Sequence, residues 1–556
     1  MVPRSPRLSV VSGRTAAASL TAACAVSVLV LTGCASPGSE AGSGPGGSEA
    51  TLVYATGDAE PTCLDPHVGG NYPQALLSSQ VLESLVSRDA SGAMIPWLAS
   101  SWETSADGLT WDFMLPEGKT FTDGTPVDAE AIRANIAHLQ DPETGSSTGY
   151  LAVAQIASVE AVSPTQARFH LTRPDAALLE SLAQPWNAIQ SPAGIERGAE
   201  ENCLAPIGTG PFVVSEWLPQ DRIVLTRNDD FTRGPEDDSG SGVAGVATVE
   251  WRFLPDSATR FAALQSGDVD IIDNPLPEQI ERAESDDALG HLDAPRPGAS
   301  NRIELNSGKA PFDDARVREA FVAAADVDAG IASLFGDTAP RSTSALSSTE
   351  PLAVSFPEVY AGDAERANEL LDEAGWTERN ADGVRVKDGK TLTLEFPVST
   401  NQSVPAEQAL FEQIQAAAAG VGFEVRLSLL DLSSWYAALA EHNYNLVSAP
   451  YTKVGPDVLR FLFHSDSTVP APSGYFANNA QVTLPELDAV LETLSRSSDD
   501  AERAAAATEA QRIVAEGHYL LPLYDQQNHF LFGAGVEGLR ALPTVSTPVL
   551  ARVTVQ

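Results

Sequence analysis

Three consecutive segments near the middle of the second half restrict the chain to few architectures. Residues 391–398 alternate between apolar and polar side chains as a strand does, 405–419 carry an apolar helical face, and 423–427 alternate again. Gly420 and Gly422 are placed to end the helix. A strand, a helix and a second strand with short connections are typical of the βαβ unit, so we expect a layered α/β fold.

A second unit of this kind is predicted at 246–272, where strand, helix and strand patterns again follow one another. Between the two units we expect one long amphipathic helix, because apolar residues recur at helical spacing: Val317, Phe321, Ala324, Ile331 and Phe335. The segment 337–357 is expected to be an exposed turn. The patterns therefore predict at least two α/β lobes.

Length and charge exclude one large class of function. The chain has 556 residues, enough for two or three globular units, and a net charge of −41 from 34 basic and 75 acidic residues. Binding to a nucleic-acid backbone needs a basic surface, and the sequence contains no sustained Lys/Arg patch. We therefore expect no nucleic-acid partner.

The N-terminus predicts an extracytoplasmic protein. Residues 1–33 contain three arginines and no acid, and the apolar stretch 15–31 leads into Leu-Thr-Gly-Cys34, which resembles the lipobox of bacterial lipoproteins. We expect 1–33 to be a signal peptide and Cys34 to become a lipidated N-terminus that anchors the chain to the cell membrane. Residues 34–50, rich in Gly, Ser and Pro, would be a flexible tether.

Two cysteines remain in the folded body, Cys63 and Cys203, in a compartment that favours oxidation. A disulfide between them is our hypothesis, and two separate buried thiols are the alternative.

Motifs for enzyme chemistry are missing from the sequence. There is no GxSxG, HExxH or GxxxxGK[ST] motif, and the eight histidines show no pair at metal-ligand spacing. GxGxxG occurs at 42–47 and 240–245, but neither copy follows a strand and opens a helix. The acids Asp268, Asp270 and Asp273 are better explained by a turn and a strand than by a cation site. We expect no enzyme activity, no cofactor and no resident metal.

Several motifs, in a fixed order, carry a family resemblance. The stretch IPWLASSWE at 95–103, with DGLTWDF at 107–113 and FTDGTPV at 121–127, resembles the dipeptide, oligopeptide and nickel class of extracellular solute-binding proteins. Further motifs follow the same family in order: GTGPF at 208–212, RFAALQSGDVD at 260–270, Leu305-Asn306, PFDDARVR at 311–318, LLDEAGW at 370–376 and LPLY at 521–524.

The resemblance implies the capture subunit of an ABC importer, with two lobes that close over a solute by a hinge, one of them carrying an extra subdomain. The partners would be a small solute and the permease subunits, and the chain would act as a monomer. The expected parts are lobe I at 51–85, 205–296 and 506–556, the extra subdomain at 86–204, and lobe II at 297–505.

Ligand-binding groups are expected in turns beyond the carboxyl ends of strands. Trp186 and Tyr451 are the candidates for stacking on the ligand, and each of the others could equally be an ordinary turn or core residue: Asn71, Tyr72, Asn187, Ser399, Asn401 and Thr452.

Peptide-binding members of this family resemble one another in a Trp-x-x-Asp-Tyr-type segment whose Asp accepts the ligand's ammonium group. The matching segment here is 449–453, which puts Thr452 in place of that Asp, with Lys453 beside it. A neutral or basic group cannot form the charge-assisted pair. If the alignment is offset, Asp457 would take the role, and binding of a free-amino peptide would then depend on it.

A peptide is thus the first expectation for the solute, while an oligosaccharide or a metal chelate stays open. Two other classes of protein are alternatives: a receptor or chaperone on the same scaffold without transport, and a secreted hydrolase with an unusual site. A permease gene next to this gene would favour the importer over both.

Overall fold

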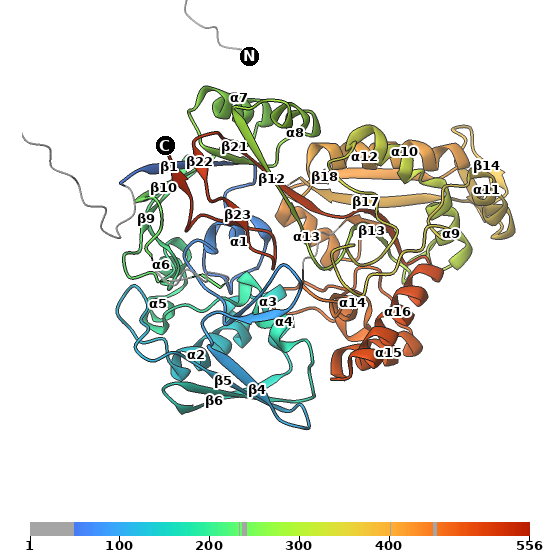
Figure 1. Cartoon of the computed structure of the whole chain (residues 1–556). Helices are drawn as coiled ribbons and strands as arrows, with labels where there is room; N and C mark the ends of the chain where they lie inside the picture. The colour runs from blue at the N-terminus through green and yellow to red at the C-terminus, as the bar shows by residue number, and fades with distance from the viewer. Residues whose placement is uncertain (1–48, 233, 236–241, 401, 449–452) are drawn as a thin grey trace, which may run out of the picture. The chain divides into compact units, whose positions relative to one another are not determined.

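The computed structural model describes residues 49–232, 234–235, 242–400, 402–448 and 453–556. Within these ranges no helix is both long and apolar enough to cross a bilayer. Figure 1 shows the strands and helices, whose buried apolar side chains gather in separate cores.

Lobe I is built on a seven-stranded sheet in the order β12-β21-β11-β1-β10-β9-β8. Strand β1 (Thr51–Thr56) lies between β10 (Thr248–Phe253) and β11 (Ile271–Asp273) and runs parallel to both. The outer strands are antiparallel to their neighbours: β8 (Phe212–Leu218), β9 (Arg222–Arg227), β12 (Leu289–Pro295) and β21 (Gln527–Gly533).

The predicted unit at 246–272 is confirmed as β10, helix α7 (Ser257–Ser266) and β11. Asp256 caps α7 by accepting the Thr259 N–H at 2.8 Å, and Gly267 ends it with φ 77°, a left-handed conformation that glycine adopts without strain. Both strands pair with β1, which enters between them. Two further helices belong to this lobe: α1 (Tyr72–Ser78) and α8 (Pro277–Glu284).

The predicted unit of lobe II is confirmed as β17 (Thr393–Ser399), α12 (Pro405–Val421) and β18 (Glu424–Leu430), with the two strands parallel. Gly422 ends α12 at φ 108°, whereas Gly420 lies inside the helix. The apolar face of α12 is buried through Leu410 and Ile414.

A second sheet of lobe II places β13 (Asn301–Leu305) between β19 (Leu446–Ser448) and β20 (Leu520–Tyr524). The remaining elements of this lobe are α11 (Ala364–Glu373), β14 (Glu378–Arg379), β15 (Arg385–Lys387), β16 (Lys390–Thr391), α13 (Leu432–Ala440), α14 (Val458–Phe463), η3 (Ser465–Thr468), α15 (Pro485–Arg496) and α16 (Asp500–Glu516).

The core contacts favour a lobe boundary about 20 residues after the predicted one at 505/506. Ala507 and Val514 of α16, and the whole of β20, are buried in the lobe II core, and β20 pairs with β13. The chain returns to lobe I only at β21. We therefore use lobe I for 49–85, 205–296 and 525–556, and lobe II for 297–524. This division of the chain remains a proposal.

The single long helix predicted around Phe321 is two helices, α9 (Ala315–Ala324) and α10 (Val327–Leu334). Asp326 separates them with φ 45°, a left-handed conformation that an α-helix cannot contain. Apolar spacing continued across the break because both helices pack on the same core.

The extra subdomain is an antiparallel sheet in the order β4-β5-β7-β6, with α2 (Ala129–Gln140) packed on β6 and β7. Asp128 caps α2 through the Ala131 N–H at 2.9 Å. The four strands of the sheet are β4 (Ser101–Thr104), β5 (Thr110–Met114), β6 (Ile156–Ser163) and β7 (Gln166–Leu171). The other elements of the subdomain are β2 (Val86–Arg88), β3 (Met94–Pro96), η1 (Pro142–Thr144), α3 (Thr148–Val153), α4 (Leu178–Leu182), η2 (Pro185–Asn187), α5 (Pro192–Glu196) and α6 (Ala199–Leu204).

The C-terminal residues of lobe I form two short antiparallel pairs, β22 (Val536–Glu537) with β25 (Thr554–Val555) and β23 (Arg540–Ala541) with β24 (Pro548–Val549).

The segment 337–357 is not an exposed turn, because Glu350 is buried within it. One carboxylate oxygen of Glu350 accepts hydrogen bonds from Arg88 at 3.0 Å, Gly298 N at 2.7 Å and Gly455 N at 2.9 Å. This side chain therefore joins the extra subdomain to two segments of lobe II.

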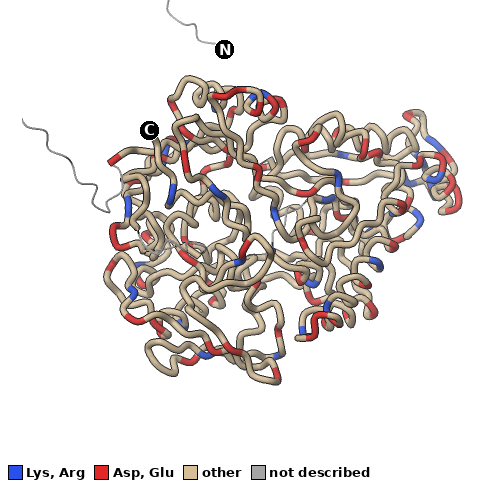
Figure 2. Tube along the Cα trace, in the orientation of Figure 1, with Lys and Arg blue, Asp and Glu red and all other residues tan. Residues whose placement is uncertain are grey.

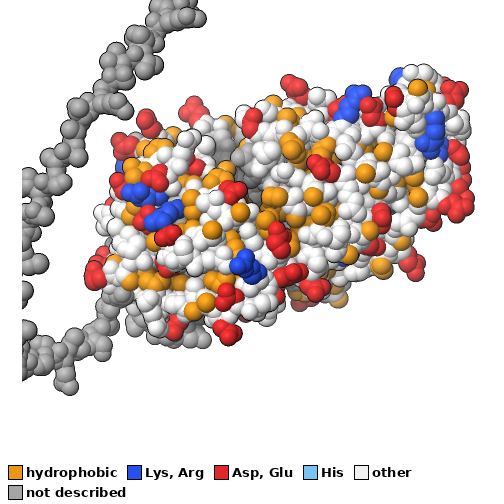
Figure 3. All heavy atoms as spheres, turned by 90° about the horizontal axis from the view of Figure 1, so that it is seen from above, with side chains coloured by type: hydrophobic (Ala, Val, Ile, Leu, Met, Phe, Trp, Pro, Cys, Tyr) orange, Lys and Arg blue, Asp and Glu red, His pale blue; other side chains and the backbone are white. Residues whose placement is uncertain are grey.

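Charged residues are spread along the described chain, as Figure 2 shows, with Asp and Glu next to Lys and Arg in many places. On the face drawn in Figure 3, Lys and Arg side chains form small groups among acidic and apolar ones. The acidic excess is thus distributed over the surface.

Candidate functional site

A cavity of about 660 Å³ is lined by loops from lobe I, lobe II and the extra subdomain. This volume lies within the range of small-molecule sites. Its lining combines aromatic rings, carboxylates, two arginines and side-chain amides, which is the mixture expected for a polar organic molecule.

The wall from lobe I stands at one edge of the seven-stranded sheet. Residues 57–59 follow β1, 255–257 follow β10 and 274–277 follow β11, and all of them line the cavity. Because these three strands are parallel, their carboxyl ends meet at one edge, which is where ligands bind in α/β sheets. The strand order therefore places the cavity.

Tyr72 and Arg296 form a stacked pair in the cavity. The Arg296 guanidinium carbon lies 4.5 Å from the centre of the Tyr72 ring, and the Tyr72 hydroxyl accepts from Asn528 Nδ2 at 2.7 Å. Burial raises the pKa of Tyr72 above its usual range, so the phenol is neutral. The aromatic face holds the cation in place.

Asp58, in the loop after β1, presents a carboxylate to the cavity. Its Oδ1 accepts from Asn274 Nδ2 at 2.9 Å, whereas its buried Oδ2 has no hydrogen-bond partner among the described residues. Burial, together with the negative charge of Asp273, raises the pKa of Asp58 to about 7.

Glu407, in the first turn of α12, lines the wall from lobe II. The side chain is buried, and Oε1 accepts from Asn301 Nδ2 at 2.7 Å. Burial raises the pKa of Glu407 to about 7. Asn301 Nδ2 also donates to the Tyr524 hydroxyl at 3.1 Å, so these three side chains are held as a unit.

Aromatic residues complete the lining. In lobe II the Trp435 and Tyr436 ring centres lie 5.1 Å apart, and Tyr475 packs edge-on against Tyr436 at 6.2 Å. Trp186 of the extra subdomain lies in the lining as well. The indole N–H groups of Trp186 and Trp435 are buried and have no acceptor within the described part of the chain.

Three predicted ligand residues line the cavity: Asn71, Tyr72 and Trp186. Asn71 also caps α1, since its side-chain oxygen accepts the Gln74 N–H at 3.0 Å. Asn187 and Ser399 are sequence neighbours of residues that line the cavity, but both are buried and neither lines it. The Asn187 side-chain amide donates to Ser181 O at 2.7 Å. Asn401, Tyr451 and Thr452 lie outside the described residues.

Asp457 does not line the cavity. Its Oδ2 accepts from Lys453 Nζ at 2.8 Å, and both side chains are almost entirely buried. A carboxylate already paired with a buried ammonium group is not available for a ligand amine. The predicted dependence of peptide binding on Asp457 therefore has no support in the geometry.

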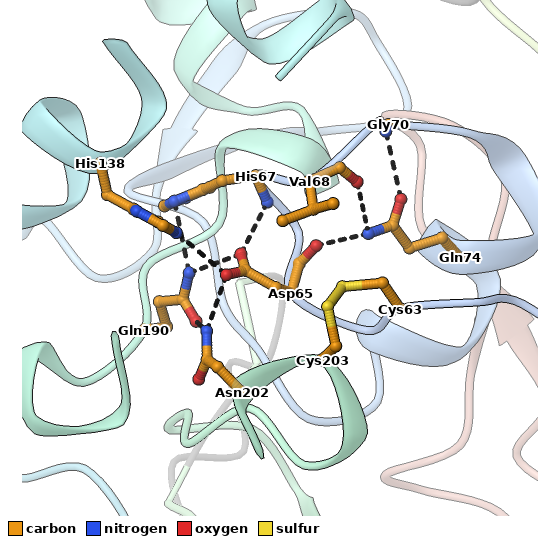
Figure 4. Close-up of a disulfide and its surroundings, with 10 residues drawn as sticks. All are labelled: Cys63, Asp65, His67, Val68, Gly70, Gln74, His138, Gln190, Asn202 and Cys203. Carbon is orange, nitrogen blue, oxygen red and sulfur yellow. Dashed lines mark hydrogen bonds and ion pairs between the residues drawn. A yellow bond between two sulfur atoms is a disulfide. The ribbon is translucent and has the colours of Figure 1, made fainter. Parts of the chain in front are cut away.

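Cys63 and Cys203 form the hypothesised disulfide, with an S–S distance of 1.98 Å across 140 residues of sequence. Figure 4 shows the polar network beside it, centred on the Asp65 carboxylate. Asp65 accepts from Gln190 Nε2, Asn202 Nδ2 and His138 Nε2, at 2.7, 2.7 and 3.0 Å respectively.

Asp65, His67 and His138 have the donor types of a metal site, with their ligand atoms within 4.8 Å of one another. The atoms of these residues that could bind a metal already make hydrogen bonds within the protein, however. His67 Nε2 donates to Ala188 O at 2.9 Å, and its Nδ1 accepts from Gln190 Nε2 at 3.3 Å. Burial lowers the pKa of His67 to about 4, so the ring is neutral. The residues fit a satisfied polar network, and not a resident metal.

The acids suspected of cation binding have structural partners instead. Asp273 accepts from Thr56 Oγ1 and Gly57 N, both at 2.7 Å, and Asp270 accepts from Val53 N at 2.7 Å. They tie β11 to β1 and to the loop that carries Asp58.

The chain belongs to the bacterial extracellular solute-binding proteins of family 5. The family profile, described as "Bacterial extracellular solute-binding proteins, family 5 Middle", matches residues 93–472. Members of this family are substrate-binding proteins of ABC transporters and are not enzymes, and they act outside the cytoplasm.

Individual relatives agree with this assignment. The nickel-binding periplasmic protein of Escherichia coli K12 is 29% identical over 453 residues, covering 80% of this chain and 83% of the relative. The glutathione-binding protein GsiB of the same strain is 28% identical, covering 66% of this chain and 67% of GsiB. The crystal structure of NikA from Brucella suis with Fe(III)-EDTA has a TM-score of 0.76 at 28% identity and covers 91% of this chain and 100% of NikA.

Sequence reasoning missed Asp58, Arg296 and Glu407, although all three line the cavity. Asp58 lies two residues after the first strand of the body. The expectation that ligand-binding groups lie beyond the carboxyl ends of strands could therefore have selected it. Glu407 looked like an ordinary acid in the first turn of a helix, and Arg296 lies between two strands with no motif around it.

Proposed function

We propose that this protein captures a small polar solute in the cavity between its lobes and delivers it to the membrane subunits of an ABC importer. A free-amino peptide or a similar amino-acid derivative is the solute that the lining fits best. Support comes chiefly from buried polar atoms of cavity residues that have no protein partner within the described ranges: Asp58 Oδ2, Trp186 Nε1, Asn301 Oδ1 and Trp435 Nε1.

Such atoms are expected where a ligand supplies the missing hydrogen bonds. Lobe I, lobe II and the extra subdomain each contribute at least one of them, so a solute that satisfies all of them would bridge these parts. A hinge movement that brings the lobes together would then be favoured by the bound solute, because only the closed state makes every contact.

The names and ligands of related proteins support a small solute for this chain. Their names specify nickel and glutathione, and the solved structures include one with Fe(III)-EDTA and, for the Helicobacter pylori protein DppA, one with the peptide STSA. An oligosaccharide or a metal chelate is the second expectation for this chain.

We further propose that Cys34 carries a lipid that holds the monomeric protein at the outer face of the cell membrane. Residues 35–50, of which 35–48 lie outside the described residues, would act as the predicted tether and let the folded body reorient, since a Gly-, Ser- and Pro-rich stretch of sixteen residues would span roughly 22 Å. The solute-loaded protein could then reach the permease without leaving the membrane surface.

The test uses soluble protein that begins at Ala35. Thermal-shift and calorimetric titrations with di- and tripeptides, glutathione, oligosaccharides and nickel chelates should identify one class that binds at 1:1. Tyr475→Ala, in the cavity lining, should weaken binding at least tenfold. Tyr150→Ala, a half-exposed tyrosine outside the lining, is the matched control and should bind normally.

Uptake of the identified solute should then fall in a strain that lacks this gene. Unchanged uptake, with binding intact, would favour the receptor or chaperone without transport. No binding of any class would contradict capture itself.

A further inference from the structure

The Asp58 carboxylate is positioned for direct contact with a solute. It lies in the turn after β1, at the edge of the sheet where the three parallel strands end. Asn274 Nδ2 donates to Oδ1 at 2.9 Å and the Asp58 backbone N–H donates to Thr56 Oγ1 at 3.0 Å, so the residue is held through both its side chain and its backbone. Its second oxygen, Oδ2, is left buried without a partner among the described residues.

The two arginines of the cavity offset the burial of Asp58 only in part: the positive charges of Arg260 and Arg296 lower its pKa, yet the pKa stays raised. Arg260 donates to the backbone oxygens of four residues, Leu254, Pro255, Asp273 and Asn274, at distances from 2.5 to 3.2 Å. Its donors are therefore committed to the loop backbone. Asp273 adds a second negative charge behind Asp58, and this repulsion together with burial raises the pKa of Asp58.

Glu407 adds another buried carboxylate from lobe II, and Arg260 and Arg296 are the two arginines of the lining. A solute that brings a positive charge to Asp58 would stabilise its ionised form, because an opposite charge favours ionisation.

We propose that Asp58 is the subsite for a protonated amine of the transported solute, which makes the ligand a primary or secondary amine. This inference rests on the proposed function. An ammonium group donates up to three hydrogen bonds and forms a charge-assisted pair with a carboxylate, which a hydroxyl or an amide cannot match.

A bare metal ion is a poorer occupant of the same position. Transition metals require three or more ligand atoms close together. Among the described residues that arrangement occurs at Asp65, His67 and His138, none of which lines the cavity.

In this arrangement lobe I binds the amine, whereas the family resemblance predicted that lobe II would bind it. The resemblance to peptide-binding proteins placed the ammonium-binding acid in the segment where this sequence has Thr452, and Asp457 is paired with Lys453. With Asp58 in this role, and Arg296 supplying the opposite charge from the same lobe, a solute with both an ammonium and a carboxylate group matches both side chains.

The experiment compares free-amino di- and tripeptide pools with the same pools after Nα-acetylation, using calorimetry at pH 7.5. Asp58→Asn keeps the size of the side chain and the Oδ1 acceptor but removes the charge. Asp363→Asn is the matched control, because Asp363 is exposed, does not line the cavity, and caps α11 through the Arg366 N–H at 2.9 Å, a role that Asn fills equally well.

The expected result is that acetylation weakens binding to the wild-type protein at least tenfold, about 1.4 kcal/mol. Asp58→Asn should weaken binding of the free-amino pool by a similar factor, with little effect on the acetylated pool, and Asp363→Asn should bind both pools as the wild-type protein does. An undiminished affinity of Asp58→Asn for the free amines would overturn the subsite while leaving capture intact, as would equal affinity for both pools. If neither these pools nor the other solute classes bind, the proposed function itself fails.

Discussion

Replacing Glu407 by Gln tests whether the cavity holds a buried carboxylate at an energetic cost to the fold. Glu407 is 2% exposed and its Oε1 accepts from Asn301. Gln keeps that acceptor and nearly the same volume, so the principal change is the loss of a titrating group.

The size of the pH-dependent change in stability follows from the pKa of Glu407. In the folded protein the pKa of Glu407 is about 7, against an ordinary value of 4.5. Between these two values the unfolded chain releases the proton while the folded chain keeps it, so this group lowers stability as the pH rises and the loss is complete above pH 7. A shift of this size corresponds to about 3 kcal/mol.

The assay is urea unfolding of the wild-type and Glu407→Gln proteins at pH 4.5 and pH 8. The difference in unfolding free energy, variant minus wild type, should be about 3 kcal/mol larger at pH 8 than at pH 4.5. Any pH-independent cost of the amide cancels in this comparison. Glu412→Gln, an exposed position on the same helix, should show no such change. A pH-independent difference for Glu407→Gln would show that the folded protein does not hold the Glu407 carboxyl at a raised pKa.

Four further outcomes are expected. Replacing both Cys63 and Cys203 by Ser should lower the unfolding free energy by about 3–5 kcal/mol, because the disulfide closes a long loop; an unchanged melting temperature would contradict this. Glu350→Ala should cost about 3–5 kcal/mol in the same assay, since it leaves a buried arginine unpaired; a loss below 1 kcal/mol would show that the pair is not important. Asp457→Asn should lower the melting temperature but leave solute affinity within twofold, and a tenfold loss of affinity would restore its predicted role in binding. Cys34→Ala should move the protein from the membrane to the soluble fraction in cell fractionation, and continued membrane retention would argue against a lipid anchor.

Local patterns in the sequence predicted much of the fold because they coincide with local structure. The alternation at 391–398, the helical face at 405–419 and Gly422 specify β17, α12 and the end of that helix without reference to the rest of the chain. The break at Asp326 could not be predicted in this way, since the apolar spacing continues through it and only the backbone conformation changes.

The site was predicted less well, because its chemistry depends on segments far apart in the sequence. The pKa of Asp58 is raised in part by the charge of Asp273, about 215 residues away in the sequence, and Asn274 donates a hydrogen bond to one of its oxygens. Glu350 is buried because Arg88 and two backbone N–H groups converge on it. No pattern around either acid distinguishes it from the many exposed acids of this chain.

Native mass spectrometry of the soluble chain from Ala35, incubated with the free-amino peptide pool, is the most direct test of amine capture in this cavity. We expect one small molecule bound per chain, retained by Tyr150→Ala and lost from Tyr475→Ala and Asp58→Asn. A chain that stays free of solute, or a solute retained equally by all variants, would contradict capture of a free-amino solute in this cavity.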